Sequence, residues 1–280
     1  MAYDYQVLLE GMRSYGSTDD EICVHGLGMH IEQVRPTVVL APCWLPSEMP
    51  TLGEATLLCQ QTGAMEARSW DVATSAGPIT FVKTNVGSPV LLEALLCLGV
   101  VPQVERVLLL GSCGSLDDDY DIGDVVVARE AVCGDGASAY LDDGMLQRAS
   151  RIGSIISANA ALYAGLLQSA QRVCADEALI CREGRTFSSD SIFCQFHHMD
   201  EMRRMDCNVI EMEAAACFRG AAMMELPAAA LFVVSDSSAA HKSLISGRHE
   251  QEIALYDHVR HEIVPRIILD WLAPGDGAGR

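Results

Sequence analysis

The chain has 280 residues, of which 50% are hydrophobic and 20% are charged, and its formal net charge is −19 at pH 7. This size and composition suit one large α/β domain, and the acidic surface argues against nucleic acid and anionic membranes as partners. No apolar run approaches the ~18–20 residues that cross a membrane, and the first residues lack the pattern of a secretion signal. A cytoplasmic protein is therefore expected.

The 11 cysteines are spread along the chain without a CxxC pair. In a chain this long and apolar, an odd number of scattered cysteines favours reduced thiols over a disulfide framework. Their spacing does not suit a structural zinc site either, so no metal and no other cofactor are expected. The pair His197-His198 beside Cys194 is a weak metal pattern and is more typical of a loop or helix surface.

Apolar runs typical of buried strands alternate along the chain with helical patterns. The clearest helix start is at Ser88, which can cap a helix whose first turn holds Pro89 and whose end is marked by Gly99. Near-continuous apolar strands separated by helices predict a mostly parallel sheet covered by helices on both faces. The predicted strands include 37–42, 79–86, 104–115, 122–132 and 227–236, and the predicted helices include 159–177 and 248–272, the last interrupted at Pro265.

The composition changes only near the two ends of the chain. Residues 1–35 are polar and irregular, and they are treated as an N-terminal extension without an assigned role. Residues 273–280 have the composition of a disordered tail. Because no Pro-rich, Ser-rich or charged run interrupts the rest, 36–272 are expected to fold as one domain.

Polar clusters follow three of the apolar runs. Ligands of open α/β sheets gather at the carboxyl ends of the strands, so polar residues at several strand ends predict one shared ligand site. If these segments were ordinary turns, there would be no reason for polar clusters to follow three separate strands. The three clusters are Gly111-Ser112-Cys113-Gly114, Glu211-Met212-Glu213 and Ser235-Asp236.

Each cluster has a chemical interpretation and a plainer one. Backbone amides in the turn at 111–114 can face a phosphate or hydroxyl group, although a simple glycine-rich turn also fits. A carboxylate such as Glu213 at the mouth of a helix can accept two hydrogen bonds from a ribose diol, or it can merely cap the helix. Asp236 follows a buried strand, so desolvation should raise its pKa and allow it to protonate a leaving group; otherwise it caps a turn.

Taken together and in this order, the motifs resemble the nucleoside phosphorylase/nucleosidase superfamily. The branch in question contains bacterial hexameric purine nucleoside phosphorylases, uridine phosphorylases and methylthioadenosine nucleosidases. The resemblance covers about residues 36–270 and implies a three-layer α/β/α fold around a mixed, partly barrel-like sheet, in a homo-oligomer that is a dimer, trimer or hexamer. The motifs are "NVGSPVLLEAL", "GSCGSLDDDYDIGDVVVAREAV", "FSSDSIF", "VIEMEAAAC" and "VVSD".

The resemblance assigns groups to the sugar and the base. It implies that Glu213 holds the ribose hydroxyls and that Met212 packs beneath the sugar. Phe187 is similar in position to the aromatic residue that stacks on the base. In several family members a histidine from a neighbouring subunit reaches the sugar 5′ position, and His25 or His30 is a candidate for that role.

The resemblance also assigns the bond-breaking groups. Asp236 matches the acid that protonates N7 of a purine, with Ser235 beside it. Arg248 is similar in position to an arginine that assists this aspartate. Gly111 and Ser112 lie where the family contacts phosphate or the ribose. An aspartate at 236 favours a purine, because pyrimidine-specific relatives have no N7 to protonate.

The sequence departs from the family pattern at the phosphate site. Leu109 stands where family phosphorylases carry an arginine, and "APCWLPSEM" stands where they carry a Gly-Asp-Pro-x-Arg loop. Arg68 is a candidate for an arginine supplied across a subunit interface, and Lys83 is another possible cation. Hydrolytic relatives use a glutamate after the first strand to position water, and Glu48 is the nearest candidate here.

The leading expectation is cleavage of a purine nucleoside by phosphorolysis, with inorganic phosphate as co-substrate and free base and ribose 1-phosphate as products. Hydrolysis is the alternative, because two phosphate arginines are missing. A nucleoside-binding protein without catalysis is a third interpretation. A pocket closed by Leu109 and Trp44, with Glu48 pointing at C1′, would favour hydrolysis over phosphorolysis.

Overall fold

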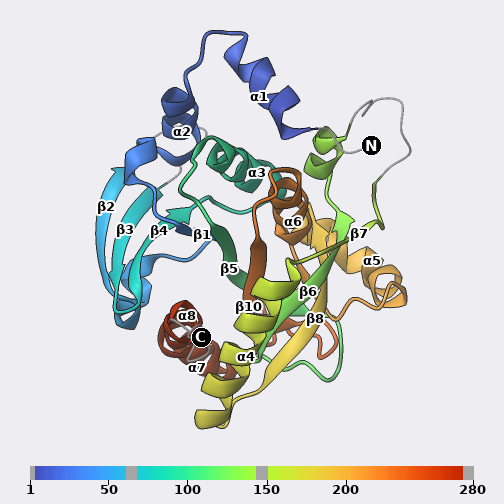
Figure 1. Ribbon diagram of the computed structural model, residues 1–280. Helices are drawn as coiled ribbons and strands as arrows, with labels where there is room; N and C mark the ends of the chain where they lie inside the picture. Colours follow the sequence, from blue (N-terminus) through green and yellow to red (C-terminus); the bar gives the residue numbers. More distant parts are fainter. Residues whose placement is uncertain (1–3, 61–67, 143–150, 274–280) are drawn as a thin grey trace.

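The computed structural model describes residues 4–60, 68–142 and 151–273 (Figure 1). Within these ranges, one ten-stranded sheet lies between helices. The strands are β1 Thr37–Ala41, β2 Glu54–Gln60, β3 Arg68–Thr74, β4 Gly77–Lys83, β5 Arg106–Ser115, β6 Val125–Gly134, β7 Ile155–Ser157, β8 Cys181–Ser189, β9 Val209–Glu211 and β10 Ala228–Ser237. The helices are α1 Tyr5–Arg13, α2 Asp19–Leu27, α3 Ser88–Leu96, α4 Ala160–Asp176, α5 Ile192–Arg204, α6 Ala214–Met223, α7 Glu250–His258 and α8 Val264–Leu272.

Five of the strands close into a ring. β5 pairs with β9 in antiparallel fashion, β9 with β8 in parallel, and β8 with β6 in parallel. β6 then pairs antiparallel with β10, and β10 returns in parallel to β5. The expected mixed, partly barrel-like sheet is therefore confirmed. A mostly parallel sheet, which the apolar runs suggest by themselves, is only an approximation, because a closed ring also buries strands that run antiparallel.

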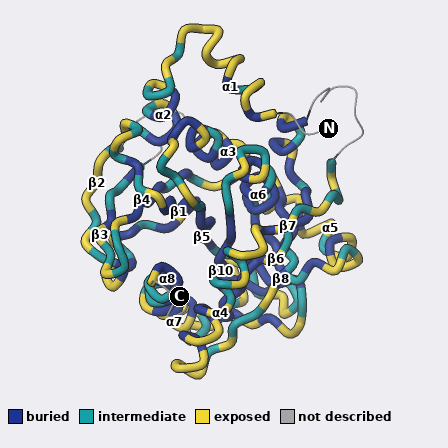
Figure 2. Tube along the Cα trace, in the orientation of Figure 1, coloured by how far each residue is buried: buried dark blue, intermediate teal, exposed yellow. Residues whose placement is uncertain are grey.

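The rest of the sheet extends from β5 as a conventional layer. β1 pairs in parallel with both β5 and β4, and the antiparallel strands β3 and β2 follow at the outer edge. Every residue of β1 and of β10 is buried, which explains why both segments are apolar throughout rather than alternating (Figure 2). Both strands therefore run through the core of the molecule.

Helices cover the sheet on both sides (Figure 1). On one side α6 packs on α3, and Gly220 allows a close approach of the two helices. A Cβ at this position would lie only 2.8 Å from the side chain of Leu95. On the other side α4 packs on α8, where Leu166 and Trp271 share one hydrophobic cluster. None of the helices in the described part of the chain has the length and apolar character needed to cross a bilayer.

The N-terminal segment joins the same core as the sheet. Cys23 and Leu27 of α2 are buried in one cluster with Val38 of β1. The phenol of Tyr5 in α1 donates a hydrogen bond of 2.7 Å to the carbonyl of Leu96 at the end of α3. The described residues before 36 therefore contribute to the central core, and 274–280 of the predicted tail lie outside the described residues.

The long C-terminal helix is interrupted, but not at the position expected. α7 ends at His258, and a π-helical turn over Val259–Ile263 connects it to α8. Pro265 lies in the first turn of α8, where its missing N–H costs little. The helical path therefore continues through the proline, and the irregular turn comes just before it.

Candidate active site

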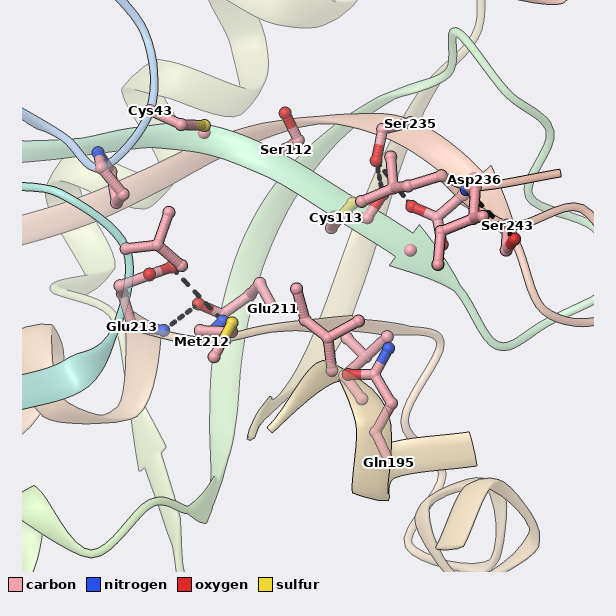
Figure 3. A pocket seen from close by; sticks show the side chains of 18 of the residues that line it. Cys43, Ser112, Cys113, Gln195, Glu211, Met212, Glu213, Ser235, Asp236 and Ser243 are labelled. Atoms are coloured by element: carbon pink, nitrogen blue, oxygen red, sulfur yellow. Dashed lines mark hydrogen bonds between the residues drawn. The ribbon is translucent and has the colours of Figure 1, made fainter. Parts of the chain in front are cut away.

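A cavity of about 330 Å³ lies between the ends of β5 and β10 and the segments that follow β1 and β9. The three polar clusters predicted to share a ligand site all line it (Figure 3). Their strands come together because the ring places β5 beside both β9 and β10. The predicted site residues that line the cavity are Gly111, Ser112, Met212, Glu213, Ser235 and Asp236.

The two buried carboxylates of the "EME" cluster have different surroundings. The hydrogen-bond acceptor capacity of the Glu211 carboxylate is used within the protein. It accepts from the hydroxyls of Ser188 and Thr186 and from two backbone amides at the start of α6. It is thus the residue that caps the helix. Glu213 accepts from the amides of Gly87, at 2.6 Å, and Met212, at 3.3 Å, and retains capacity to bind a ligand.

Burial and the neighbouring Glu211 carboxylate raise the pKa of Glu213 to about 8. Burial raises the pKa of Glu211 as well, but its four hydrogen-bond donors oppose that shift, so we place the proton of the pair on Glu213. A protonated Glu213 can both donate to and accept from hydroxyl groups. That capacity suits a vicinal diol, in which each hydroxyl is itself a donor and an acceptor.

Asp236 lies at the other end of the cavity, near the end of β10 (Figure 3). The pairing of β10 with β5 shifts register between Val234 and Asp236, a bulge that redirects the strand at this point. The hydroxyl of Ser235 lies 2.7 Å from Asp236 Oδ1. Burial raises the pKa of Asp236, and the Ser235 hydrogen bond and the Arg248 charge partly oppose that shift. A buried carboxyl of this kind can serve as a proton donor.

Arg248 holds the chain around Asp236. Its guanidinium donates to the backbone carbonyl of Ser235 at 3.2 Å and to that of Leu244 at 3.0 Å. These contacts bring the loop after β10 back onto the strand end. Arg248 therefore lies close to Asp236, as expected. It donates its hydrogen bond to the backbone carbonyl of the neighbouring Ser235 rather than to the carboxyl group of Asp236.

The wall around Ser112 is built by residues distant in sequence. The indole Nε1 of Trp44 donates to Ser112 Oγ at 3.1 Å, and the Tyr256 hydroxyl lies 2.6 Å from the same atom. Trp44 and Tyr256 are both buried. Cys43, which follows β1, is exposed and lines the cavity beside this group. Trp44 and Leu109 were expected to close the pocket here, but neither is among the lining residues: Trp44 contacts Ser112 from behind the wall, and Leu109 is buried within β5.

Glu48 is held outside the cavity by its own contacts. Its carboxylate forms an ion pair with Arg260 and accepts a hydrogen bond from the Leu45 amide at 2.8 Å. The guanidinium of Arg260 also lies 5.2 Å from the centroid of the Trp44 ring. Glu48 does not line the cavity. It supports the loop that carries Trp44, so the water-positioning role assigned to it lacks geometric support here.

Phe187 packs behind the site rather than lining it. It lies in a hydrophobic cluster with Val132 and Ile210. The alternation of β8 explains this, because Thr186 and Ser188 on either side of it both reach Glu211. Two other aromatic residues line the cavity, namely Tyr256 of α7 and Phe196 of α5, which exposes 47% of its surface.

The remaining candidates lie away from the cavity of their own subunit. Arg68 begins β3, opposite Lys83 of β4 in the sheet. His30 Nδ1 lies 2.7 Å from an oxygen of Asp20 on the surface, and His25 lines a separate groove between the N-terminal helices and α3. Contributions from these residues across a subunit interface stay predictions.

Sequence reasoning missed Tyr256, Cys43 and Phe196. Tyr256 lies in an amphipathic helix more than a hundred residues from Ser112, so no local pattern marks it. Cys43 follows directly after the apolar run of β1. A position just after a strand end was therefore a signal in the sequence that this residue could line the site. Phe196 is an apolar residue on the exposed face of α5, and such exposure becomes visible only once the helix is placed.

Curated proteins with similar sequences are purine nucleoside phosphorylases. The DeoD-type enzyme of Mycoplasma genitalium is 27% identical over 147 residues, which cover 51% of this chain and 57% of the relative. That of Dichelobacter nodosus is 27% identical over 134 residues, which cover 48% and 52%. The match thus spans only about half the length of these curated relatives.

Solved structures share the fold at low sequence identity. A uridine phosphorylase from Vibrio fischeri has a TM-score of 0.67 at 17% identity and covers 86% of this chain and 92% of that one. A methylthioadenosine/S-adenosylhomocysteine nucleosidase from Campylobacter jejuni has a TM-score of 0.63 at 14% identity and covers 85% and 98%.

The family model described as the phosphorylase superfamily matches residues 49–262, well over half of the chain. The closed five-stranded ring, the clustered strand ends and the two buried carboxylates are consistent with that match. The chain therefore belongs to the phosphorylase superfamily.

Proposed function

We propose that this protein cleaves the N-glycosidic bond of a purine nucleoside. The observation that carries the proposal is the presence of two buried carboxylic acids, Glu213 and Asp236, at opposite ends of one cavity (Figure 3). The cavity, about 330 Å³, lies at the lower end of the range for small-molecule sites, which suits a nucleoside.

Asp236 is the proposed proton donor to the base. When the bond between C1′ and N9 breaks, its electron pair leaves with the purine, and protonation at N7 stabilises that leaving group. Burial keeps the carboxyl of Asp236 protonated to a higher pH than usual. Arg248, bonded to the Ser235 carbonyl, fixes the strand end that presents the acid.

Glu213 is the proposed group that binds the sugar. Its anchoring by the Gly87 and Met212 amides sets the position of the carboxyl, and the side chain of Met212 lines the same part of the cavity. Holding the ribose at two hydroxyls fixes C1′ between the two acids. Positioning of this kind lowers the activation free energy, because the entropy of orienting the reacting groups is lost on binding rather than in the reaction step.

Water is the acceptor that the contacts around Ser112 support best. The Ser112 hydroxyl is already bonded to Trp44 and lies against Tyr256. Among the described residues that line the cavity, three are carboxylic acids and none is Arg, Lys or His. The charge of nearby Arg260 is balanced by Glu48. A phosphate dianion would find no cation among these lining residues to balance its charge, whereas water needs none.

Phosphorolysis is the second candidate. It is favoured by the names of the curated relatives, which are purine nucleoside phosphorylases, and by the Gly111-Ser112 turn on the cavity wall. This reaction would need a cation that the cavity of one subunit does not supply from its described residues. Arg68 of a neighbouring subunit is the proposed source.

The test is a panel of inosine, adenosine, guanosine, methylthioadenosine and uridine, each with and without phosphate. Free base, ribose and ribose 1-phosphate are measured. Base release from purine nucleosides with free ribose, at a rate that phosphate does not change, supports the hydrolytic form of the proposal. Ribose 1-phosphate formed only with phosphate would support phosphorolysis. Intact purine nucleosides, beside a control enzyme that cleaves them, would refute catalysis on these substrates.

A further inference from the structure

Tyr256 is a buried polar side chain whose role the predicted site does not explain. Within α7, all of whose residues are described, only Tyr256 is buried, and its hydroxyl ends 2.6 Å from Ser112 Oγ on the cavity wall. The ring comes from the C-terminal part of the chain and meets the strand end of β5. A tyrosine in such a place fixes the position of one hydroxyl precisely, because its ring is held by packing.

The hydrogen-bond capacity of this group can be counted. Trp44 Nε1 can only donate, so it uses one acceptor position of Ser112. Ser112 and Tyr256 have two hydroxyl hydrogens, and their mutual contact uses one of them, whichever atom donates. The thiol of Cys43 also forms a hydrogen bond with Ser112, and Trp44 also forms one with Tyr256. Sulfur is only a weak hydrogen-bonding group, so one hydroxyl hydrogen and free lone pairs remain available on a wall of the cavity for a stronger partner.

The remaining capacity matches a neutral acceptor molecule. A phosphate dianion presents many acceptor oxygens and needs several donors, preferably charged ones. Water needs only one donor and one acceptor to be held in a fixed orientation, and the pair supplies both. In Figure 3, Ser112 lies on the wall between the end that carries Glu213 and the end that carries Asp236. That is where C1′ lies if the sugar and the base occupy the two ends as proposed.

We propose that the hydroxyl of Tyr256, together with that of Ser112, holds the water molecule that attacks C1′. This inference rests on the proposed function. The water oxygen bonds to C1′, and the electron pair of the C1′–N9 bond leaves with the purine. N7 receives the proton of Asp236, and the proton that water loses passes to solvent, from which Asp236 is protonated again. The products are the free base and ribose.

Tyr256 acts by positioning, because burial raises the pKa of its phenol and keeps it neutral at physiological pH. The test is Tyr256→Phe, which removes the hydroxyl and keeps the ring, compared with Tyr15→Phe at a residue that is 93% exposed. We expect kcat for hydrolysis of inosine to fall about 10–100-fold in Tyr256→Phe, with KM changed less than about 3-fold. The dissociation constant of Tyr256→Phe for 9-deazainosine, an analogue whose glycosidic bond is carbon–carbon and is not cleaved, should equal that of the parent. In Tyr15→Phe, kcat and KM should both be unchanged.

Several results would overturn the inference. One is a kcat of Tyr256→Phe within about 3-fold of the parent; another is an equal loss of 9-deazainosine affinity, which would show a structural role. Ribose 1-phosphate as the product of the parent protein would also refute it while leaving glycosidic cleavage intact. Absence of any base release by the parent would instead refute the proposed function itself. If Tyr256→Phe does not fold, Ser112→Ala tests the other hydroxyl. The same lower kcat is then expected, with little change in KM or in the dissociation constant of 9-deazainosine.

Discussion

The two halves of the cavity are built in different ways. The half proposed to bind sugar and base is made by short motifs at strand ends, with Glu213 following β9 and Asp236 near the end of β10. The half around Ser112 is assembled from three remote segments, namely the loop after β1, the end of β5, and α7. Motifs therefore indicate what the protein binds, whereas the acceptor depends on contacts that only the folded chain brings together.

The difference is also electrostatic. The strand-end half contains buried carboxyl groups, and Glu213 has its pKa raised to about 8 by burial and Glu211. The Ser112 half presents hydroxyl, thiol and indole groups, and its nearest guanidinium, that of Arg260, is paired with Glu48. We expect substitutions in the first half to remove bond cleavage or sugar binding, and substitutions in the second half to alter only the transfer to the acceptor.

Replacement of the proposed acid should have the largest effect. Asp236→Asn removes the proton donor, so kcat for inosine should fall by about 10²–10⁴-fold. A p-nitrophenyl riboside, whose leaving group needs no proton, should be cleaved at nearly the parental rate. Asp118→Asn, at an exposed carboxylate, is the matched control and should behave as the parent. An equal loss on both substrates would contradict the assignment of Asp236 as the acid.

The two carboxylates of the "EME" cluster should respond in opposite ways. Glu213→Gln should lower kcat/KM for inosine about 10–100-fold without lowering the free energy of unfolding, because it removes a sugar ligand but leaves a neutral group beside Glu211. Glu211→Gln should reduce the free energy of unfolding by about 1–3 kcal/mol, because four donors lose their ionised partner. Urea unfolding and steady-state kinetics on both variants check this. A stable, fully active Glu211→Gln protein would refute the capping role.

The raised pKa of Glu213 predicts a pH-dependent stability. Its pKa is about 8 in the folded state against an ordinary value of 4.5, so between these pH values the folded chain keeps a proton that the unfolded chain has lost. Stability should therefore fall as pH rises through this window, by up to about 1.4 kcal/mol per pH unit. Urea unfolding at pH 5, 6, 7 and 8 measures the slope, and Glu213→Gln should lack this contribution. Parallel pH profiles for the two proteins would contradict the prediction.

Cys43 should give the smallest effect on turnover. Cys43→Ser should keep kcat within about 3-fold of the parent, because a hydroxyl preserves the weak polar contact beside Ser112. Iodoacetamide should nevertheless inactivate the parent by filling the cavity. The reaction should be faster at pH 9 than at pH 7, because desolvation inside the cavity raises the pKa of this thiol although the residue is exposed at the surface. Cys43→Ser should resist inactivation, whereas Cys194→Ser, at an exposed cysteine on α5, should remain sensitive. Inactivation of both variants alike would place the reactive thiol elsewhere.

The fold and the strand-end half of the site were largely predictable from the sequence. The apolar runs locate β1, β5 and β10, and the polar residues that follow them meet because adjacent strands end at one edge. Ring closure could not be derived from the runs themselves, since a buried antiparallel strand is as apolar as a parallel one. It followed from the family resemblance.

Side-chain direction was the main quantity that the sequence left open. A shift of one residue in β8 exchanges Phe187 for Ser188, and the packing of the fold rather than the motif decides which of them faces Glu211. The position of Tyr256 depends on how α7 returns to the sheet, a contact between residues 144 apart in sequence. The ion pair of Glu48 with Arg260 joins residues even farther apart, with a separation of 212 residues.

The pairing of β10 with β5 has a consequence for the order of assembly. It joins residues near 107 to residues near 228, and β10 is the last strand along the chain. During synthesis from the N-terminus the ring cannot close until this strand has emerged, so closure of the ring is a late step that rests on long-range contacts. The same strand carries Asp236. The chain therefore acquires its proposed acid and the wall that surrounds it in a single event, and a nascent chain that stops before residue 228 has neither.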